Sequence, residues 1–233
     1  MKKVLYTIGC LVLIAILIKL VLLGMFFKQV PVATFGVKQH LFGAGGVVDK
    51  VFPMGYHFSF RPLFKWHMLD RRMHVIHFVG KDTAQQQESN NIRKRKRMHI
   101  RTRDNNIAYL DVSVLYSIIP GEAFKVVQDG IQSSYQDRAQ STMEGVLRAE
   151  LAKLTSEGYQ DTDKRMALQG TTVTVLNTLL APFHLKAESI LIRGLQFQTE
   201  YESKLQDKQL QKQLSKLEEA KLGQFEEEKV TKG

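Results

Sequence analysis

Cysteine is almost absent from this sequence, and so are the motifs that usually accompany enzyme chemistry. The 233 residues contain one cysteine, Cys10, which lies in an apolar stretch near the N-terminus. A single cysteine excludes an intrachain disulfide and leaves no thiol cluster for a metal. No Walker A loop, G-x-S-x-G elbow, H-E-x-x-H helix or dinucleotide fingerprint occurs in a fitting context. The sequence therefore predicts a protein that is not an enzyme and that binds no cofactor.

Histidine is concentrated in one stretch, which raises the question of a metal site. His57, His67, His74 and His77 are close in sequence. Successive residues of a strand alternate faces, so His74 and His77 would point to opposite sides of an extended strand. No cysteine lies nearby to complete a zinc site. We interpret these residues as ordinary strand histidines and predict no metal.

Acidic residues are missing from the first 27 positions. The segment Val4–Phe27 is apolar except for Thr7, Lys19 and small residues. As a helix it would be about 36 Å long, enough to cross a hydrocarbon core of about 30 Å. A cleaved signal peptide fits less well, because the apolar stretch is too long and "PVATF" is a poor cleavage site. We predict an uncleaved anchor, residues 1–27.

The charges that flank this segment predict its orientation. Lys2, Lys3 and the free amine precede it, whereas only Lys28 and Lys38 follow it before Asp49. This bias favours a cytoplasmic N-terminus and a body on the translocated side, as in a single-pass inner-membrane protein with a periplasmic domain. Lys19 lies inside the segment, where it either snorkels to the interface or contacts a partner helix.

The remainder alternates between strand and helix patterns, which predicts an α+β fold. Residues 30–80 contain short β-branched and apolar runs, and Gly43–Gly46 leads into a strand and so forms a turn rather than a phosphate loop. In the stretch 107–118 every even position is apolar, as in a half-buried strand. Helices are expected at 120–130, 140–157 and 161–181, the last capped by Asp161 or Thr162 and ended before Pro182. A strand at 184–197 and a long polar helix follow.

Acids are also absent from the most basic stretch, residues 93–103, in which seven of eleven residues are Lys or Arg. These seven charges equal the excess positive charge of the whole chain after residue 27, since the net charge is +10 and the first 27 residues carry +3. On a strand, the even positions Met98, Ile100 and Thr102 would face a core. The odd positions would form a cationic face that comprises Arg93, Arg95, Arg97, His99, Arg101 and Arg103.

Burial predicts how this strand pairs with the next one. A three-residue loop, Asp104–Asn106, pairs Ile100 with Leu110 and Met98 with Val112, and keeps the apolar side chains on one face. Asn106 would then be the left-handed residue of the loop, and His99 would lie opposite Asp111.

The cationic face has several possible partners. Nucleic acid is disfavoured, because no aromatic residues are interleaved and the body is predicted outside the cytoplasm. Anionic lipid headgroups or an acidic surface of a neighbouring protomer fit better than a solvated face, because unpaired arginines one strand step apart repel each other.

The final segment, 197–233, is predicted as an exit helix with a broken apolar seam. Lysines recur every four residues along one face, at Lys204, Lys208, Lys212 and Lys216. This spacing places like charges side by side. The face is either solvated or packed against a partner helix that offers acids, such as Glu218 and Glu219 of a neighbouring copy.

The order of these segments resembles the SPFH/band 7 superfamily, which includes stomatin, prohibitin, flotillin and the HflK–HflC proteins. The most telling pieces are Thr102-Arg103-Asp104-Asn105, "LDVSVLYSI" followed by Pro120, and Asp163 with Arg165. The resemblance implies an SPFH domain at 28–196, with a β-rich first half at 28–91 and an α/β second half at 92–196. Family members usually continue into a longer helical tail, so the chain is either short or a piece of a longer one.

The resemblance also implies a function. Such proteins are non-enzymatic scaffolds that oligomerise into rings or cages, mark membrane microdomains and regulate membrane proteases. The single anchor and its orientation make the chain most similar to the HflK/HflC branch, which surrounds an FtsH-type AAA protease. Self-association, or assembly with a paralogous SPFH protein, is then expected. The alternative is a membrane-tethered monomeric or dimeric module that binds anionic lipid or polymer through the basic hairpin.

Overall fold

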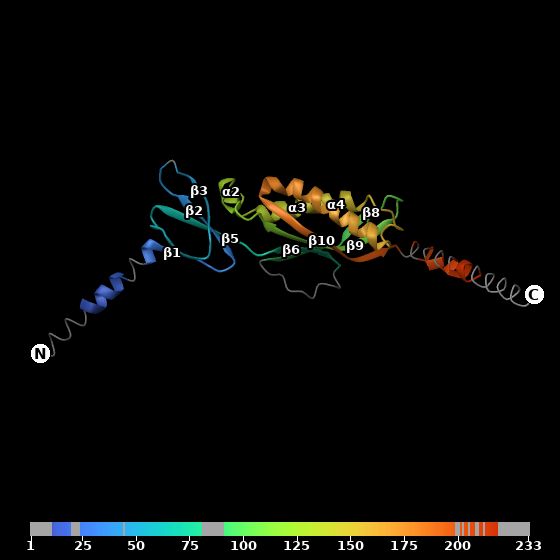
Figure 1. Ribbon diagram of the computed structural model, residues 1–233, viewed down its shortest axis with the longest axis horizontal. Helices are drawn as coiled ribbons and strands as arrows, with labels where there is room; N and C mark the ends of the chain where they lie inside the picture. Colours follow the sequence, from blue (N-terminus) through green and yellow to red (C-terminus); the bar gives the residue numbers. More distant parts are fainter. Residues whose placement is uncertain are drawn as a thin grey trace, which may run out of the picture.

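The computed structural model describes most of the chain. The described residues are 11–19, 24–43, 45–80, 91–198, 201, 203, 204, 206, 207, 210, 211 and 213–218. The molecule is elongated, with helical residues 11–19 at one end and the helical residues between 201 and 218 at the other (Figure 1). Two parts lie between them: a β-region (residues 27–70) and an α/β region (residues 74–197).

The β-region consists of two small antiparallel sheets. One pairs β1 (Phe27–Val30) with β4 (Gly55–Phe58), and the other has the order β3-β2-β5, formed by Val47–Phe52, Thr34–His40 and Phe64–Asp70. Gly43 and Gly46 have positive φ angles of 85° and 52° and join β2 to β3. The prediction of a turn at the glycines is confirmed, since positive φ is a conformation that glycine adopts without steric cost.

A five-stranded sheet forms the base of the α/β region. Its order is β10-β9-β6-β7, and β8 also pairs with β9. The strands are β6 (His74–Val79), β7 (Ile92–Lys96), β8 (Met98–Arg101), β9 (Ile107–Ile118) and β10 (Leu185–Phe197). The even positions of β9, Ala108 to Ile118, are at most 2% exposed, as their alternation predicts. The strand β6, which the sequence analysis groups with the first half, belongs to this sheet, because Ile76 and Phe78 lie opposite Val114 and Val112 of β9.

Three α-helices accompany the sheet. They are α2 (Ala123–Gln128), α3 (Tyr135–Leu151) and α4 (Thr162–Leu180), and a short 3-10 helix, η2 (Ala181–Phe183), follows α4. Asp161 caps α4 by accepting hydrogen bonds from the amides of Asp163 and Lys164, so one of the two predicted caps is confirmed. The helices α3 and α4 cover one face of the sheet (Figure 1), while α2 packs against β2 and β3 of the β-region.

The hairpin β8–β9 has a different register from the predicted one. Met98 pairs with Leu110 and Ile100 with Ala108, so the connecting loop has five residues, 102–106, and the three-residue loop is wrong. The left-handed residue is Asn105, with φ of 66°, not Asn106. His99 lies opposite Tyr109 rather than Asp111. The alternation is nevertheless right, because a shift of two residues leaves every side chain on its predicted face.

A set of long-range hydrogen bonds explains the longer loop. Thr102 is only 3% exposed, and its amide donates to the carbonyl of Asn106 at 2.9 Å. Asp104 accepts from the amide of Ser156 at 3.0 Å, in the connection between α3 and α4. The loop is therefore shaped by a contact 52 residues away in sequence, which no hairpin rule contains.

The N-terminal segment is described only in part. Residues 11–19 and 24–26 are helical, and the other residues of the predicted anchor lie outside the described ones. Within the part of the chain that the structure describes, no helix is both long and apolar enough to cross a bilayer.

Candidate interaction surfaces

A cluster of aromatic residues lies at the end of the β-region next to the N-terminal helical residues. The ring of Phe26 stacks on Phe58 and Phe60, with centroids 6.0 and 5.2 Å apart, and Phe27 contacts Phe58 edge-on at 6.1 Å. The amide of Ser59 donates to the carbonyl of Phe26 at 2.7 Å. We call Phe26, Phe27, Tyr56, Phe58 and Phe60 the aromatic end.

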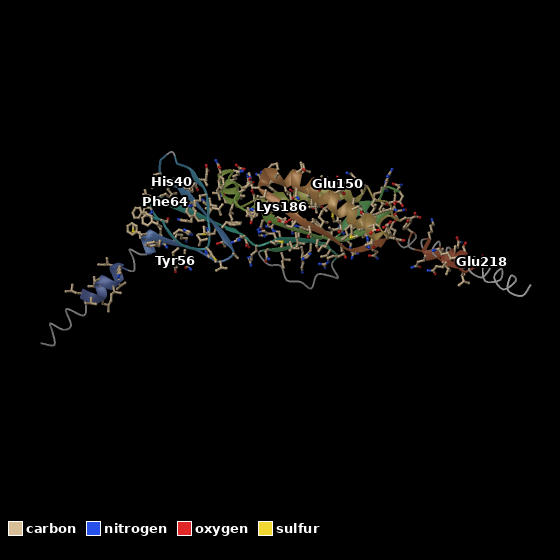
Figure 2. The ribbon with its side chains drawn as sticks, viewed as in Figure 1. His40, Tyr56, Phe64, Glu150, Lys186 and Glu218 are labelled. Carbon is tan, nitrogen blue, oxygen red and sulfur yellow. The ribbon has the colours of Figure 1, made fainter. Side chains whose placement is uncertain are left out.

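Much of the aromatic end is in contact with solvent. Tyr56 is 72% and Phe58 63% exposed, and Figure 2 shows Tyr56 at the end of the body from which the N-terminal helical residues extend. An exposed patch of large apolar side chains is typical of a protein or membrane contact. Lys38 adds a cation here: its Nζ lies 3.6 Å from the ring centroid of Phe64, and burial lowers the pKa of its amine. The patch thus combines aromatic rings with a neighbouring positive charge.

The basic stretch does not form one continuous cationic face. From Ile92 to Lys96 the chain forms β7, which pairs in parallel with β6. After Arg97 it forms β8, which lies one strand further into the sheet and pairs with β9. Arg97 lies at this crossing, where Asp111 accepts from its Nε and Nη2 at 2.7 and 2.9 Å. The predicted single ribbon is therefore corrected, because the strand changes its partner halfway along.

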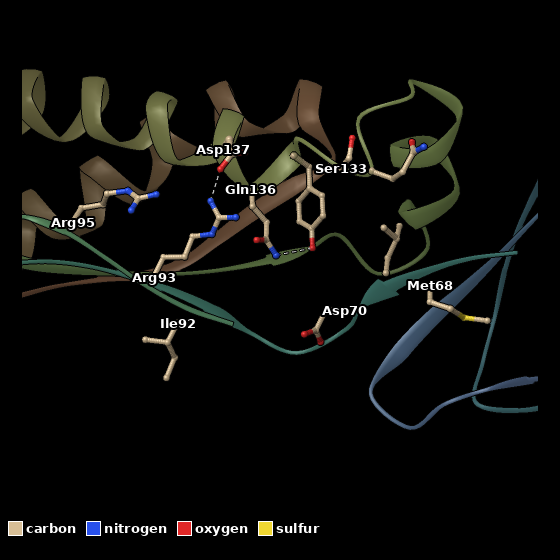
Figure 3. A pocket seen from close by; sticks show the side chains of 11 residues that line it. Met68, Asp70, Ile92, Arg93, Arg95, Ser133, Gln136 and Asp137 are labelled. Carbon is tan, nitrogen blue, oxygen red and sulfur yellow. Dashed lines mark hydrogen bonds and ion pairs between the residues drawn. The ribbon is translucent and has the colours of Figure 1, made fainter. Parts of the chain in front are cut away.

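The arginines on either side of the crossing have different surroundings. Arg93 and Arg95 lie on the same side of the sheet as α3, where Arg93 forms an ion pair with Asp137 (Figure 3). Arg101 and Arg103 lie beyond the crossing and are exposed. The hydrogen bond from Arg93 lowers the pKa of the Asp137 carboxyl.

A cleft of about 770 Å³ lies at the junction of the two regions. The end of β5 contributes Met68, Leu69 and Asp70, and β7 contributes Ile92, Arg93 and Arg95. The turn before α3 and its first residues supply the polar wall, which comprises Gln132, Ser133, Tyr135, Gln136 and Asp137. Here the side-chain Nε2 of Gln136 donates to the hydroxyl of Tyr135 at 3.2 Å. The volume is in the range of sites that hold small ligands or peptide side chains.

The sheet face opposite the helices carries a second group of cations. His77, on β6, is hydrogen-bonded to Ser113 at 2.8 Å, and burial, followed by the positive charges of Arg193 and Lys94, lowers the pKa of its imidazole. The sequence interpretation did not single out Arg193. Only the pairing of β10 with β9 brings it near the basic stretch, and no local pattern predicts that pairing.

The four histidines are separate from one another, and each has its own neighbour. His74 is buried and stacks on Tyr116, while His77 faces the other side of β6, so the predicted alternation is confirmed. His57 contacts the carbonyl of Pro53 at 2.7 Å, and His67 contacts Gln39 at 2.8 Å.

The remaining predicted contact residues lie at the two ends of the chain. Lys19 is exposed at the end of the helical residues 11–19. Lys204 and Lys216 are exposed on the helical residues beyond the sheet, and Lys208 and Lys212 lie outside the described residues.

Comparison with known proteins identifies the class. The SPFH domain / Band 7 family matches residues 28–229, which is most of the chain. The chain therefore belongs to the SPFH domain / Band 7 family. This is a family of membrane-associated scaffold proteins whose members generally oligomerise and are generally not enzymes. No curated protein matches the chain.

Proposed function

We propose that the protein is a membrane-anchored, non-enzymatic scaffold whose β-region rests on the bilayer surface through the aromatic end. The observation that carries this proposal is the exposure of Tyr56 and Phe58 beside Phe26 and Phe27, which end the apolar stretch Val4–Phe27. If that stretch crosses the membrane, the aromatic end lies at the level of the headgroups.

The energetics favour this placement. Full burial of a Phe side chain is worth about 1.5–3 kcal/mol, so several half-exposed rings gain appreciable free energy on entering the interface. Aromatic side chains are enriched at this depth of membrane proteins. Lys28 and Arg61 are next to these rings in sequence, and Lys38 Nζ donates to the carbonyl of Phe58 at 3.4 Å, so all three would approach lipid phosphates. The N-terminus would be cytoplasmic and the body periplasmic, in a single-pass inner-membrane protein.

The oligomeric part of the proposal follows from the family. The chain would assemble into a ring or cage, alone or with a paralogous SPFH protein, organise a membrane microdomain and limit the access of an FtsH-type AAA protease to its substrates, as in the HflK/HflC branch. The exit helix, with Lys204 and Lys216 on its exposed surface, is available for a helix–helix contact in such an assembly.

The mass of the full chain in mild detergent tests the assembly. Light scattering and negative-stain imaging should show a closed particle of many copies, alone or with a co-purifying paralogue or protease. A homogeneous monomer or dimer would contradict the ring. It would favour the second candidate, a tethered binding module, for which the exposed Arg101 and Arg103 at the tip of the β8–β9 hairpin are the specific observation.

A further inference from the structure

The cleft at the junction of the two regions has an unbalanced set of charges. Asp70 is already bound by Arg72, with 2.7 Å between Nη2 and Oδ2. On the opposite wall, Asp137 is the only carboxylate among the described lining residues near both Arg93 and Arg95. Two guanidinium groups thus share one carboxylate, and a second anion would neutralise the wall. Planar guanidinium groups bind carboxylates in pairs of hydrogen bonds, which makes this the chemistry that the wall favours.

The cleft also contains a hydrogen-bond acceptor without a donor. The Oε1 atom of Gln132 is buried and accepts no hydrogen bond from any of the described residues. Buried side-chain oxygens in native proteins nearly always accept a hydrogen bond from protein or ordered water, so this oxygen is open to a donor that a ligand brings. A peptide N–H is such a donor.

The rest of the wall suits a polypeptide side chain. Met68 provides apolar surface, Leu69 and Tyr135 are buried behind it, and Ser133 lies exposed at the edge. Figure 3 shows Arg93 and Arg95 pointing toward α3 from the strand, with Met68 and Asp70 on the far side of the cleft. The cleft therefore offers a cationic wall, an acceptor and an apolar wall to one extended segment.

We propose that this cleft binds an acidic, extended polypeptide segment. A carboxylate of the segment lies between Arg93 and Arg95, a main-chain N–H donates to Gln132 Oε1, and an apolar side chain packs on Met68. A phosphodiester group would meet the arginines but offers Gln132 no donor. In addition, the β-region separates the cleft from the N-terminal helical residues (Figure 1), so the observations favour a polypeptide over a lipid.

Peptide binding to the full chain in mild detergent tests this inference. The probe is a fluorescein-labelled peptide, Gly-Leu-Glu-Leu-Glu-Leu-Gly, and its twin carries Gln in place of Glu. Loss of a charged hydrogen bond weakens binding about ten-fold or more, so Arg95→Gln should raise the Kd of the Glu peptide by that factor. The matched control is Arg101→Gln, an arginine of the same basic stretch outside the cleft, which should leave the Kd within about two-fold.

A second variant separates recognition from folding. Ser133→Trp adds bulk at the edge of the cleft without removing a charge, and it should also weaken the Glu peptide. Among the described residues, the one hydrogen bond that Arg95 donates goes to the carbonyl of its neighbour Lys94. Its positive charge also lies near the like charge of Arg93. Arg95→Gln should therefore keep the melting temperature within about 2 °C of the parent protein.

Three results would overturn the inference. They are equal binding of the Glu and Gln peptides, equal losses for Arg95→Gln and Arg101→Gln, and unchanged binding by Ser133→Trp. If excess Glu peptide also lowers the particle mass, the natural segment comes from a second copy; if the mass is unchanged, it comes from another protein. The peptide affinity tests the cleft proposal alone, and a negative result would leave the scaffold proposal unaffected. Likewise, a particle mass that contradicts the ring would not bear on peptide binding.

Discussion

Asp111 binds the Nε and Nη2 atoms of Arg97 at 2.7 and 2.9 Å, and thereby holds the basic stretch at the point where it changes partner strand. The same carboxylate accepts from the amide of Gly80 at 3.3 Å. Space is short here, because a Cβ on Gly194 would lie 3.1 Å from Asp111 Oδ2 and one on Gly80 would lie 3.1 Å from Arg97. This one carboxylate, inside β9, therefore connects to the residues that follow β6 and β7.

Removal of this carboxylate should destabilise the fold. Asp111→Ala removes the acceptor of Arg97 Nε and Nη2 and of the Gly80 amide, in a site where Asp111 is 13% exposed. We expect a loss of about 1–3 kcal/mol in the free energy of unfolding. Urea unfolding followed by circular dichroism measures it. The control is Glu144→Ala, which removes an exposed helix pair with Arg148 and should cost no more than about 0.5 kcal/mol. Equal losses for the two variants would contradict the structural role of Asp111.

Arg97 also shows where sequence reasoning ends. The alternation of Met98, Ile100 and Thr102 correctly predicts their burial, because the period of a strand is a local property. The same alternation extends the cationic face through Arg97 without a break. Nothing local indicates that β7 pairs with β6 while β8 pairs with β9, since that depends on which strands meet in the folded sheet.

For the candidate sites, too, local features were predictable from the sequence and features that depend on strand pairing were not. The aromatic end joins Phe26 and Phe27, which end the apolar N-terminal stretch, to aromatic residues of β4 and its surroundings. The sequence interpretation did not single it out, because Phe26 and Phe58 meet only when β1 pairs with β4. The cleft combines residues from β5, β7 and the start of α3, and no spacing rule joins them. The helix cap at Asp161 was predictable, because capping is decided within four residues.

The contact between Asp104 and Ser156 should make stability dependent on acid pH. Burial alone would raise the pKa of Asp104, but hydrogen bonds from Thr102 and Ser156 outweigh it and lower the pKa. A folded-state pKa below the unfolded value, about 3.9, means that the carboxylate stabilises the fold above that pH. This contribution disappears as the pH falls through the folded-state pKa.

Asp104→Asn tests this dependence. The variant should be less stable than the parent protein at pH 6, and the difference should shrink toward zero as the pH falls below about 4. Urea midpoints measured from pH 3 to pH 6 give the comparison, and Asp49→Asn, on an exposed position of β3, is the matched control. A constant difference across this range would show that the charge of Asp104 has no stabilising role.

The aromatic end should be immersed in the interface when the protein is in lipid. In a Cys10→Ser background, an NBD dye attached at Tyr56→Cys should shift to shorter wavelength and gain intensity on reconstitution into vesicles. The same dye at Lys153→Cys, an exposed site after α3 in the α/β region, should not change. Equal spectra at the two sites would contradict the contact between the β-region and the bilayer. This result would not bear on the peptide cleft.

His184 should hold α2 in the position that links the two regions. Its ring nitrogens lie 3.0 Å from Glu122 and 2.9 Å from Asp129, at the two ends of α2, and its φ of 59° is left-handed. Asn tolerates left-handed backbone, so His184→Asn should not strain the chain. Its side chain is too short to reach both carboxylates, so the variant removes only the contacts. We expect a loss of about 1–2 kcal/mol in stability and faster hydrogen exchange of the α2 amides, with α4 unaffected. Uniformly faster exchange in α2 and α4 would indicate general destabilisation and contradict a local link. Because α2 packs against β2 and β3, a selective effect would show that His184 couples the β-region to the α/β region, and with it the aromatic end to the sheet.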